Sequence, residues 1–446
     1  MWPELHLETI TKDSISILKD IYAFKFEFPK LFISSQSLVE IWEYMPEAKE
    51  TVLYIDGQDD YQAVGQVIWE DLFTEIYIPT FCPMNGYKLL QLFSTLKDLS
   101  RLKIVSIACE MDVKMAFMLK QCLCGAFLEE LNLELVYFND RYLQLLCQAL
   151  PETRIKKLNL YRNEISSEGL DCLGKVLLNT DIEELNIGRN YISRTGLESL
   201  ANGMVGSKLK TLHLQECEEL SPDDLDCVFA LLPHIPLENF HYYGEFSKST
   251  EKILIDNLPK SNLKSISFLI SHYLPEFLKA CSNIKDLLLF NDENGICFDI
   301  ADNMKYLNLE TLRFRHTKIQ MDGLEKLMSA IVDSNIRHLY FSQIRWPLEA
   351  LAILARYLPG TKIQELHLNG CNSTQDGIVE FAKCIKETRL KRLNIWSHCN
   401  SIHTISAILE NIGSRIQYLD LTGARDIDRN TARKLVLQHP SLTIKY

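Results

Sequence analysis

The sequence predicts an α/β solenoid, a fold in which a short strand–loop–helix unit is repeated along the chain and stacked on copies of itself. The first observation is a motif, Leu-x-x-Leu-x-Leu, that recurs about every 27 residues along most of the 446-residue chain. The second is alternation within the motif: in Leu158-Asn159-Leu160 the two leucines fall on one face of a strand and the asparagine on the other. The third is helical spacing of the apolar residues that follow, as at Leu197 and Leu200.

About 14 repeats can be placed, with starts mostly 25–29 residues apart. The predicted starts are Phe73, Leu102, Leu128, Ile155, Ile182, Leu209, Leu237, Leu263, Ile284, Leu309, Ile336, Ile363, Leu390 and Ile416. Each start is expected to begin a short strand, and a repeat of this length leaves room for a full helix. Parallel strands stacked in this way predict a horseshoe with a concave sheet and convex helices.

Small residues recur at fixed places in the repeats. Asn163 and Asn190 lie eight residues past their starts, where a side-chain amide can bond free backbone groups and form a ladder between repeats. Cys217 and Cys371 hold the same place in other repeats. Glycines recur near the beginning of the expected helices and predict a tight turn from loop to helix; they are Gly169, Gly196, Gly323 and Gly377.

One repeat is irregular. The step from Leu263 to Ile284 is only 21 residues. Residues 273–278 leave room for at most two helical turns, and residues 291–295 are typical of a loop. We therefore expect altered curvature at this point.

The two ends of the chain fit the repeat less well. Residues 1–72 are expected to be degenerate repeats that cap the stack, with an independent N-terminal domain as the alternative, and residues 73–446 form the repeat domain. Within the first region, 34–44 predicts a helix, and 5–7 and 51–55 predict strands. At the other end, 431–438 predicts a helix and 442–444 a last strand.

The charge distribution argues against a nucleic-acid partner. The formal net charge is -12, and residues 1–150 carry 22 acidic against 12 basic side chains. A nucleic-acid footprint would show clustered lysine and arginine. The acidic N-terminal third indicates either an ordinary solvated face or a basic protein partner.

Composition also favours a cytoplasmic protein. The 13 cysteines are odd in number and scattered, which is unlike a disulfide framework and indicates reduced thiols. No signal peptide is visible at the N-terminus, and no apolar run approaches the length of a membrane span. We expect no membrane anchor and a chain that is monomeric on its own.

The motif Leu-x-x-Leu-x-Leu-x-x-Asn-x-Ile, intact at residues 155–165 and 182–192, resembles the ribonuclease-inhibitor-like class of leucine-rich-repeat proteins. The resemblance covers about residues 73–446 and implies a leucine-rich-repeat solenoid. The class includes ribonuclease inhibitors, Ran GTPase-activating proteins, F-box substrate receptors, innate immune sensors and host-directed bacterial effectors, which share protein binding on the concave face or its rim. This chain lacks the alternating cysteine-dense repeats of ribonuclease inhibitors, the acidic tail of Ran activators and a convincing F-box in residues 1–50.

The resemblance and the alternation together predict where a partner binds. Residues two, four and six places past each start should face the concave side. Tyrosine, tryptophan and arginine dominate interface energetics, and such residues have no packing purpose in exposed rows. The predicted partner-binding residues are Tyr161, His213, His241, Tyr243, Arg313, Arg315, Tyr340, His367 and Trp396, with Arg162 and Arg189 on the rim.

The sequence contains no pattern that favours catalysis or a cofactor. His213 and His241 with the nearby Cys217 provide too few ligands for zinc, and a buried thiol is a poor nucleophile. No glycine-rich phosphate-binding loop is present. We therefore expect a non-enzymatic protein-interaction scaffold. The alternatives are a GTPase-activating protein of the Ran-activator type, with Arg162 or Arg189 as its catalytic arginine, and a substrate-recognition subunit of a ubiquitin ligase or a host-directed effector.

Overall fold

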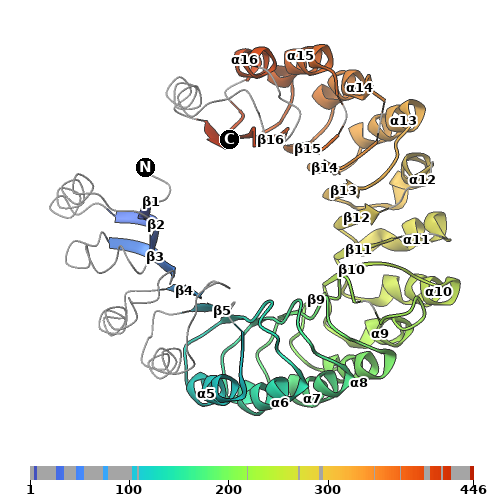
Figure 1. Cartoon of the computed structure of the whole chain (residues 1–446). Coiled ribbons are helices and arrows are strands. Elements are labelled where there is room, and N and C mark those ends of the chain that lie inside the picture. Colours follow the sequence, from blue (N-terminus) through green and yellow to red (C-terminus); the bar gives the residue numbers. More distant parts are fainter. Residues whose placement is uncertain are drawn as a thin grey trace, which may run out of the picture. The chain divides into compact units, whose positions relative to one another are not determined.

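A computed structural model of the chain describes residues 5–7, 27–34, 47–54, 74–78, 103–107, 110–217, 219–269, 272–290, 295–345, 347–371, 373–395, 402–412, 415–422 and 442–445. The chain divides into two compact units, Met1–Leu237 and Glu238–Tyr446, each of which is described by itself. Each unit is a stretch of α/β solenoid in which parallel strands alternate with helices (Figure 1). Among the described helices, none is long and apolar enough to cross a membrane.

The strands of the first unit form a parallel sheet in chain order. They are β1 (Leu5–Leu7), β2 (Glu27–Ser34), β3 (Glu47–Tyr54), β4 (Glu75–Ile78), β5 (Ile104–Ile107), β6 (Glu130–Asn132), β7 (Lys157–Asn159), β8 (Glu184–Asn186) and β9 (Thr211–His213). Each strand pairs with the next, from β1 with β2 to β8 with β9. The central residue of the motif is buried in β4 to β9, as at Leu131, Leu158 and Leu185.

Helices follow the strands of the first unit and lie along one side of them (Figure 1). Their bounds are α5 (Val113–Leu123), α6 (Asp140–Ala149), α7 (Ser167–Leu177), α8 (Arg194–Met204) and α9 (Asp226–Leu231), with 3₁₀ turns η3 (Leu150–Glu152) and η4 (Leu232–His234). Asp112, Asn139 and Ser166 cap three of these helices through their side-chain oxygens.

The second unit repeats this arrangement. Its strands are β10 (Asn239–Glu245), β11 (Ser265–Leu269), β12 (Asp286–Phe290), β13 (Thr311–Arg315), β14 (His338–Ser342), β15 (Glu365–Asn369), β16 (Arg392–Asn394), β17 (Tyr418–Asp420) and β18 (Thr443–Lys445), paired parallel in chain order. Its helices are α10 (Lys248–Asn257), α11 (Leu274–Ala280), α12 (Ile296–Asn303), α13 (Met321–Val332), α14 (Ala350–Tyr357), α15 (Gln375–Cys384) and α16 (Ile402–Asn411). The 3₁₀ turns are η5 (Leu258–Lys260), η6 (Cys281–Asn283), η7 (Met304–Tyr306), η8 (Leu358–Gly360) and η9 (Ile385–Glu387).

The predicted repeat register is confirmed. From β4 to β17, every strand begins two residues after its predicted start. In the short repeat, α11 covers seven residues, which agrees with the prediction of at most two turns. The predicted strands at 5–7, 51–55 and 442–444 correspond to β1, β3 and β18, although β3 begins earlier than predicted.

Some predictions fall on residues that the structure leaves out. The predicted helix at 34–44 lies outside the described residues except for Ser34, which ends β2 instead. The predicted helix at 431–438 and residues 291–294 of the predicted loop also lie outside them. The division at residue 72 stays a prediction, and β3 pairs with β4 across it in the same parallel register as later strands.

The asparagine ladder is confirmed in the first unit. The Asn163 Nδ2 amide donates to the carbonyls of Leu133 at 2.7 Å and Leu160 at 3.0 Å, and its Oδ1 accepts from the backbone amides of Val136 and Phe138. Asn190 bridges its neighbours in the same way. Cys217 and Cys371 make longer sulfur contacts there, 3.7 Å and 3.5 Å to carbonyl oxygens of the preceding repeat. The ladder therefore joins adjacent repeats most firmly where asparagine is present.

The glycines near the helix starts have a different role from the predicted one. Gly169, Gly196, Gly323 and Gly377 all lie within the first turn of a helix, and none adopts the left-handed backbone that a tight turn would need. At Gly196, an added Cβ would lie 2.6 Å from the Ser167 Cα. Here glycine permits close approach of successive helices, so the prediction of a loop-to-helix turn is wrong.

A left-handed residue recurs seven places past the predicted starts. The φ angle lies between +53° and +62° at Leu135, Arg162, Arg189, Glu216, His316, Gln343 and Gly370. Most of these are not glycine, so each costs on the order of 1 kcal/mol of backbone strain. This conformation turns the chain away from the strand and fixes where the two rim arginines emerge.

Candidate protein-binding surface

The residues that project from the strands away from the core form continuous rows in the second unit. Arg313, Tyr340, His367, Asn394 and Asp420 are direct partners on successive strands, four places past their starts. Adjacent strands lie about 4.8 Å apart, so neighbouring members of a row can touch. We call this side of the sheet, opposite the buried leucines, the open face.

Arg313 and Tyr340 form the centre of this surface. The Arg313 guanidinium makes a two-pronged ion pair with Asp286, with Nε–Oδ1 at 3.1 Å and Nη2–Oδ2 at 3.0 Å. The same guanidinium lies over the Tyr340 ring, 4.4 Å from its centroid, and the Tyr340 ring lies 4.3 Å from that of His367. Burial, followed by the charge of Glu365, raises the pKa of Tyr340. These contacts hold three predicted residues in one stack.

Glu365 joins this stack to the next strands. The His367 Nε2 lies 2.7 Å from one Glu365 oxygen, and Arg392 Nε lies 3.3 Å from the same oxygen. The Arg392 guanidinium in turn lies 4.3 Å from the Tyr418 ring centroid. Burial alone would raise the pKa of Glu365. The hydrogen bond and charge of His367, together with Arg392, outweigh burial, so the pKa lies below its usual value and the carboxylate is ionised at neutral pH. Burial, with the charges of Arg392 and Arg313, lowers the pKa of His367, although Glu365 opposes the change.

A second cluster lies six places past the starts. Tyr243 and Phe290 have ring centroids 4.7 Å apart, and the Arg315 guanidinium lies 5.8–5.9 Å from both rings. Tyr243 keeps 38% of its surface exposed, a high value for a large ring. We call Tyr243, Phe290 and Arg315 the aromatic cluster.

Two other predicted residues of the second unit, His241 and Trp396, are not placed in the Arg313–Tyr340–His367 stack or in the aromatic cluster. His241 Nδ1 lies 3.1 Å from the Ser267 hydroxyl on the next strand. Trp396 lies outside the described residues.

The predicted residues of the first unit gather around Glu216. The Tyr161 hydroxyl donates to Glu216 Oε1 at 3.2 Å, and Arg189 Nε lies 3.6 Å from Glu216 Oε2. Burial and then Glu216 raise the pKa of Tyr161. A hollow of about 300 Å³ at this rim is lined by Leu135, Tyr137, Arg162, Asn163, Glu164, Arg189, Asn190, Tyr191 and Glu216. His213 is engaged by Glu184 at 3.3 Å and by the Gln215 amide at 3.2 Å.

The buried thiols are unsuited to nucleophilic chemistry. Burial raises the pKa of Cys217 to about 11 and that of Cys147 to about 12. A thiolate, which is the reactive form, is therefore scarce at neutral pH. In the described part of the chain, no group of three or more histidine, cysteine, aspartate or glutamate side chains is placed to hold a metal ion.

Comparisons with known proteins leave the family of this chain open. No protein-family model matches the sequence. No curated protein matches it either. Among solved structures, the chain is similar to the yeast complex of Rad7 and Elc1, with a TM-score of 0.45 and 17% sequence identity, over 87% of this chain and 83% of that one.

The acidic and basic residues two places past the starts were not predicted to belong to the surface. Asp286 and Glu365 contact the predicted Arg313 and His367, Arg392 lies over Tyr418, which was not predicted either, and Phe290 completes the aromatic cluster. A signal was available: Asp286 and Arg313 are oppositely charged diagonal neighbours on adjacent strands, and Glu365 lies two residues before His367 on the same strand face.

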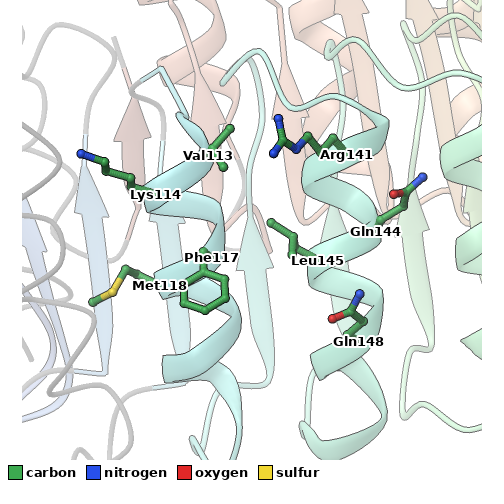
Figure 2. Close-up of a pocket in the computed structure, with 8 residues that line it drawn as sticks. All are labelled: Val113, Lys114, Phe117, Met118, Arg141, Gln144, Leu145 and Gln148. Carbon is green, nitrogen blue, oxygen red and sulfur yellow. The ribbon is translucent and has the colours of Figure 1, made fainter.

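A further hollow lies between α5 and α6 of the first unit, on the helix side. Figure 2 shows its lining, with Phe117 and Leu145 lying between the two helices. Phe117 keeps 46% and Val113 38% of its surface exposed. This hollow contains none of the predicted residues.

Proposed function

We propose that this chain is a non-enzymatic, cytoplasmic leucine-rich-repeat protein of the ribonuclease-inhibitor-like class that binds a folded protein through the open face of its second unit. The observation that carries the proposal is the pre-formed stack of Asp286, Arg313, Tyr340 and His367, side chains that are only partly buried on a face presented by successive strands.

The residue types favour a protein partner. Arginine and tyrosine bury a large area while satisfying a polar group, and they are enriched among residues that dominate binding energy. Here the arginine is already paired and stacked, so binding orders it further at little entropic cost. A stack of this kind is ready to receive a complementary surface.

The extent of the surface also suits a protein. The aromatic cluster begins on β10, and the stack ends on β15, five strand spacings away. At about 4.8 Å per spacing, the row is on the order of 24 Å long, comparable to the width of a standard protein interface. A small ligand would fill only a fraction of it.

The cytoplasmic assignment rests on the cysteines. The thiols of Cys147, Cys217, Cys281 and Cys297 are buried in the fold and form no disulfide. Free thiols persist in compartments that keep them reduced.

The proposal can be tested with a matched pair of tyrosine variants. Affinity capture from a native extract with the wild-type chain would provide a partner, whose affinity is then measured with purified components. Tyr340→Ala should weaken binding about thirtyfold, the equivalent of about 2 kcal/mol for a central interface residue. Tyr306→Ala is the control, because Tyr306 is an equally large ring, 42% exposed, in η7 outside the open face.

The result would support the proposal only if Tyr340→Ala also keeps the thermal stability of the wild type. Equal affinity in the two variants, or unfolding of Tyr340→Ala, would count against the open face as the binding surface.

A further inference from the structure

The amino-terminal edges of the strands carry a regular pattern of charge. We use "edge positions" for the residues immediately before and after each predicted start. In the first unit, Lys103 and Lys156 flank Glu129, with ion pairs of 3.7 Å and 3.0 Å. Two further pairs follow on later strands: Asp181–Lys208 at 2.5 Å and Glu183–Lys210 at 2.8 Å. Along this edge, Lys103, Lys156, Lys208 and Lys210 pair with acids of neighbouring repeats, whereas Arg154 lies over the Phe127 ring.

The second unit begins in the same way and then departs from the pattern. Lys264 pairs with Glu238 at 2.8 Å, and Lys285 pairs with Glu310 at 3.6 Å. In the repeats that start at Ile363, Leu390 and Ile416, the edge positions hold no acid. They are Lys362, Gln364, Arg389, Lys391, Arg415 and Gln417, which we call the basic edge.

The backbone brings these residues together. The amide of Lys391 donates to the carbonyl of Gln364 at 2.7 Å, and the amide of Gln417 donates to that of Lys391 at 2.8 Å. Their side chains therefore leave adjacent strands side by side. A hollow of about 430 Å³ is lined by Gln364, Arg389, Lys391, Arg415 and Gln417.

Within the part of the chain that the structure describes, the cations of the basic edge have no acidic partner. Arg389 and Lys391 are exposed and form no ion pair within the described residues. The Arg415 guanidinium donates to the Thr388 carbonyl at 3.2 Å, and Lys362 contacts the neutral Asn335 amide at 3.1 Å. The nearby Glu365 is engaged on the open face by His367 and Arg392. Like charges gathered without counter-charge repel one another, which an anionic ligand would relieve.

We propose that the basic edge binds an extended acidic segment of a protein. The cations are spread over three adjacent strands, about 10 Å from first to last. A single phosphate would reach only part of this row, whereas glutamates at alternate positions of an extended peptide, roughly 7 Å apart, match its length. The glutamine amides between the cations can bond the peptide backbone. Nucleic acid fits less well, because the cations form a short cluster on a chain of net charge -12.

The probe is a fluorescein-labelled octaglutamate peptide, with the octaglutamine peptide as its neutral counterpart, measured by fluorescence anisotropy with the full chain at low ionic strength. The octaglutamate should bind, weaken as salt is added, and lose about tenfold in affinity in the double variant Arg389→Gln with Lys391→Gln. The octaglutamine should not bind.

The control double variant is Lys156→Gln with Lys210→Gln. It removes the same charge from the same edge of the sheet, but at positions paired with Glu129 and Glu183. It should bind octaglutamate as well as the wild type does. Equal losses in both double variants would show a net-charge effect and overturn the proposal, as would absence of binding to the wild type or tighter binding of a single-stranded oligonucleotide of equal length.

Tyr340→Ala keeps this test independent of the open face. It should leave octaglutamate binding unchanged, so failure of one proposal does not imply failure of the other. A thermal melt of each variant confirms that the glutamine substitutions, all at side chains outside the core, leave the fold intact.

Discussion

Replacing Asn163 by alanine should destabilise the first unit far more than an ordinary surface change. Its side chain accepts from the backbone amides of Val136 at 3.1 Å and Phe138 at 2.9 Å and donates to the Leu133 carbonyl at 2.7 Å. Asn163 keeps only 7% of its surface exposed. Its removal leaves these groups buried without a partner.

The magnitude follows from the number of orphaned donors. A buried donor left without its partner costs about 1–3 kcal/mol. Asn163→Ala orphans two amides and should therefore lower the free energy of unfolding by about 4 kcal/mol. Asn190→Ala orphans the Ile165 amide, held at 3.0 Å, and should cost about 2 kcal/mol. Asn179→Ala is the control, since Asn179 is exposed, and it should stay within about 0.5 kcal/mol of the wild type.

The assay is equilibrium unfolding in urea followed by far-UV circular dichroism, with hydrogen exchange at the Val136 and Phe138 amides as a local probe. Those two amides should lose protection in Asn163→Ala. The reasoning would be refuted if Asn163→Ala cost no more than Asn190→Ala, or if both amides kept the protection that they have in the wild type.

Two other predictions concern helix packing and pH. Gly174→Ala should lower the free energy of unfolding by about 1–3 kcal/mol, although alanine favours helices, because its Cβ would lie 2.5 Å from the Ser199 carbonyl oxygen. Gly323→Ala should cost less, because its Cβ would lie 3.2 Å from the side chain of Phe298. Equal urea midpoints of the two variants would contradict this prediction. His367 has a folded-state pKa below its unfolded value of about 6.5, so its contribution to stability is present above that pH and lost as pH falls through the folded-state pKa. His367→Gln should therefore flatten the fall in urea midpoint from about pH 7.5 to about pH 5.5, and an unchanged slope would refute the assignment.

Much of the fold could be predicted because it depends on short-range pattern. The central apolar residue of the motif is buried in every described repeat, so the spacing of apolar residues places each strand from β4 to β17. The asparagine ladder follows from the same spacing, since the asparagine at a fixed place in the repeat donates to a backbone carbonyl of the preceding repeat.

The role of the glycines could not be predicted from short-range pattern. Whether Gly196 serves a turn or a close helix contact depends on the distance to Ser167 in the preceding repeat. No local pattern contains that distance. Strand β2 was not predicted for a similar reason, because it lacks the leucine spacing and is recognised through its pairing with β1 and β3.

The candidate surface could be predicted only in part. Alternation identified Arg313, Tyr340 and His367 as neighbours, and the structure places them in contact. Asp286 and Glu365, which orient these side chains, were not predicted. The prediction considered aromatic and basic residues and not the acids that pair with them.

The left-handed residue seven places past the starts of seven repeats has a consequence for redesign. Arginine, glutamate, histidine, glutamine and glycine all occupy this place with nearly the same φ, so the course of the chain there is insensitive to the side chain it carries. The non-glycine residues already bear the strain of the conformation. Substituting these left-handed residues together should create a new binding surface, because none of the buried apolar residues would change.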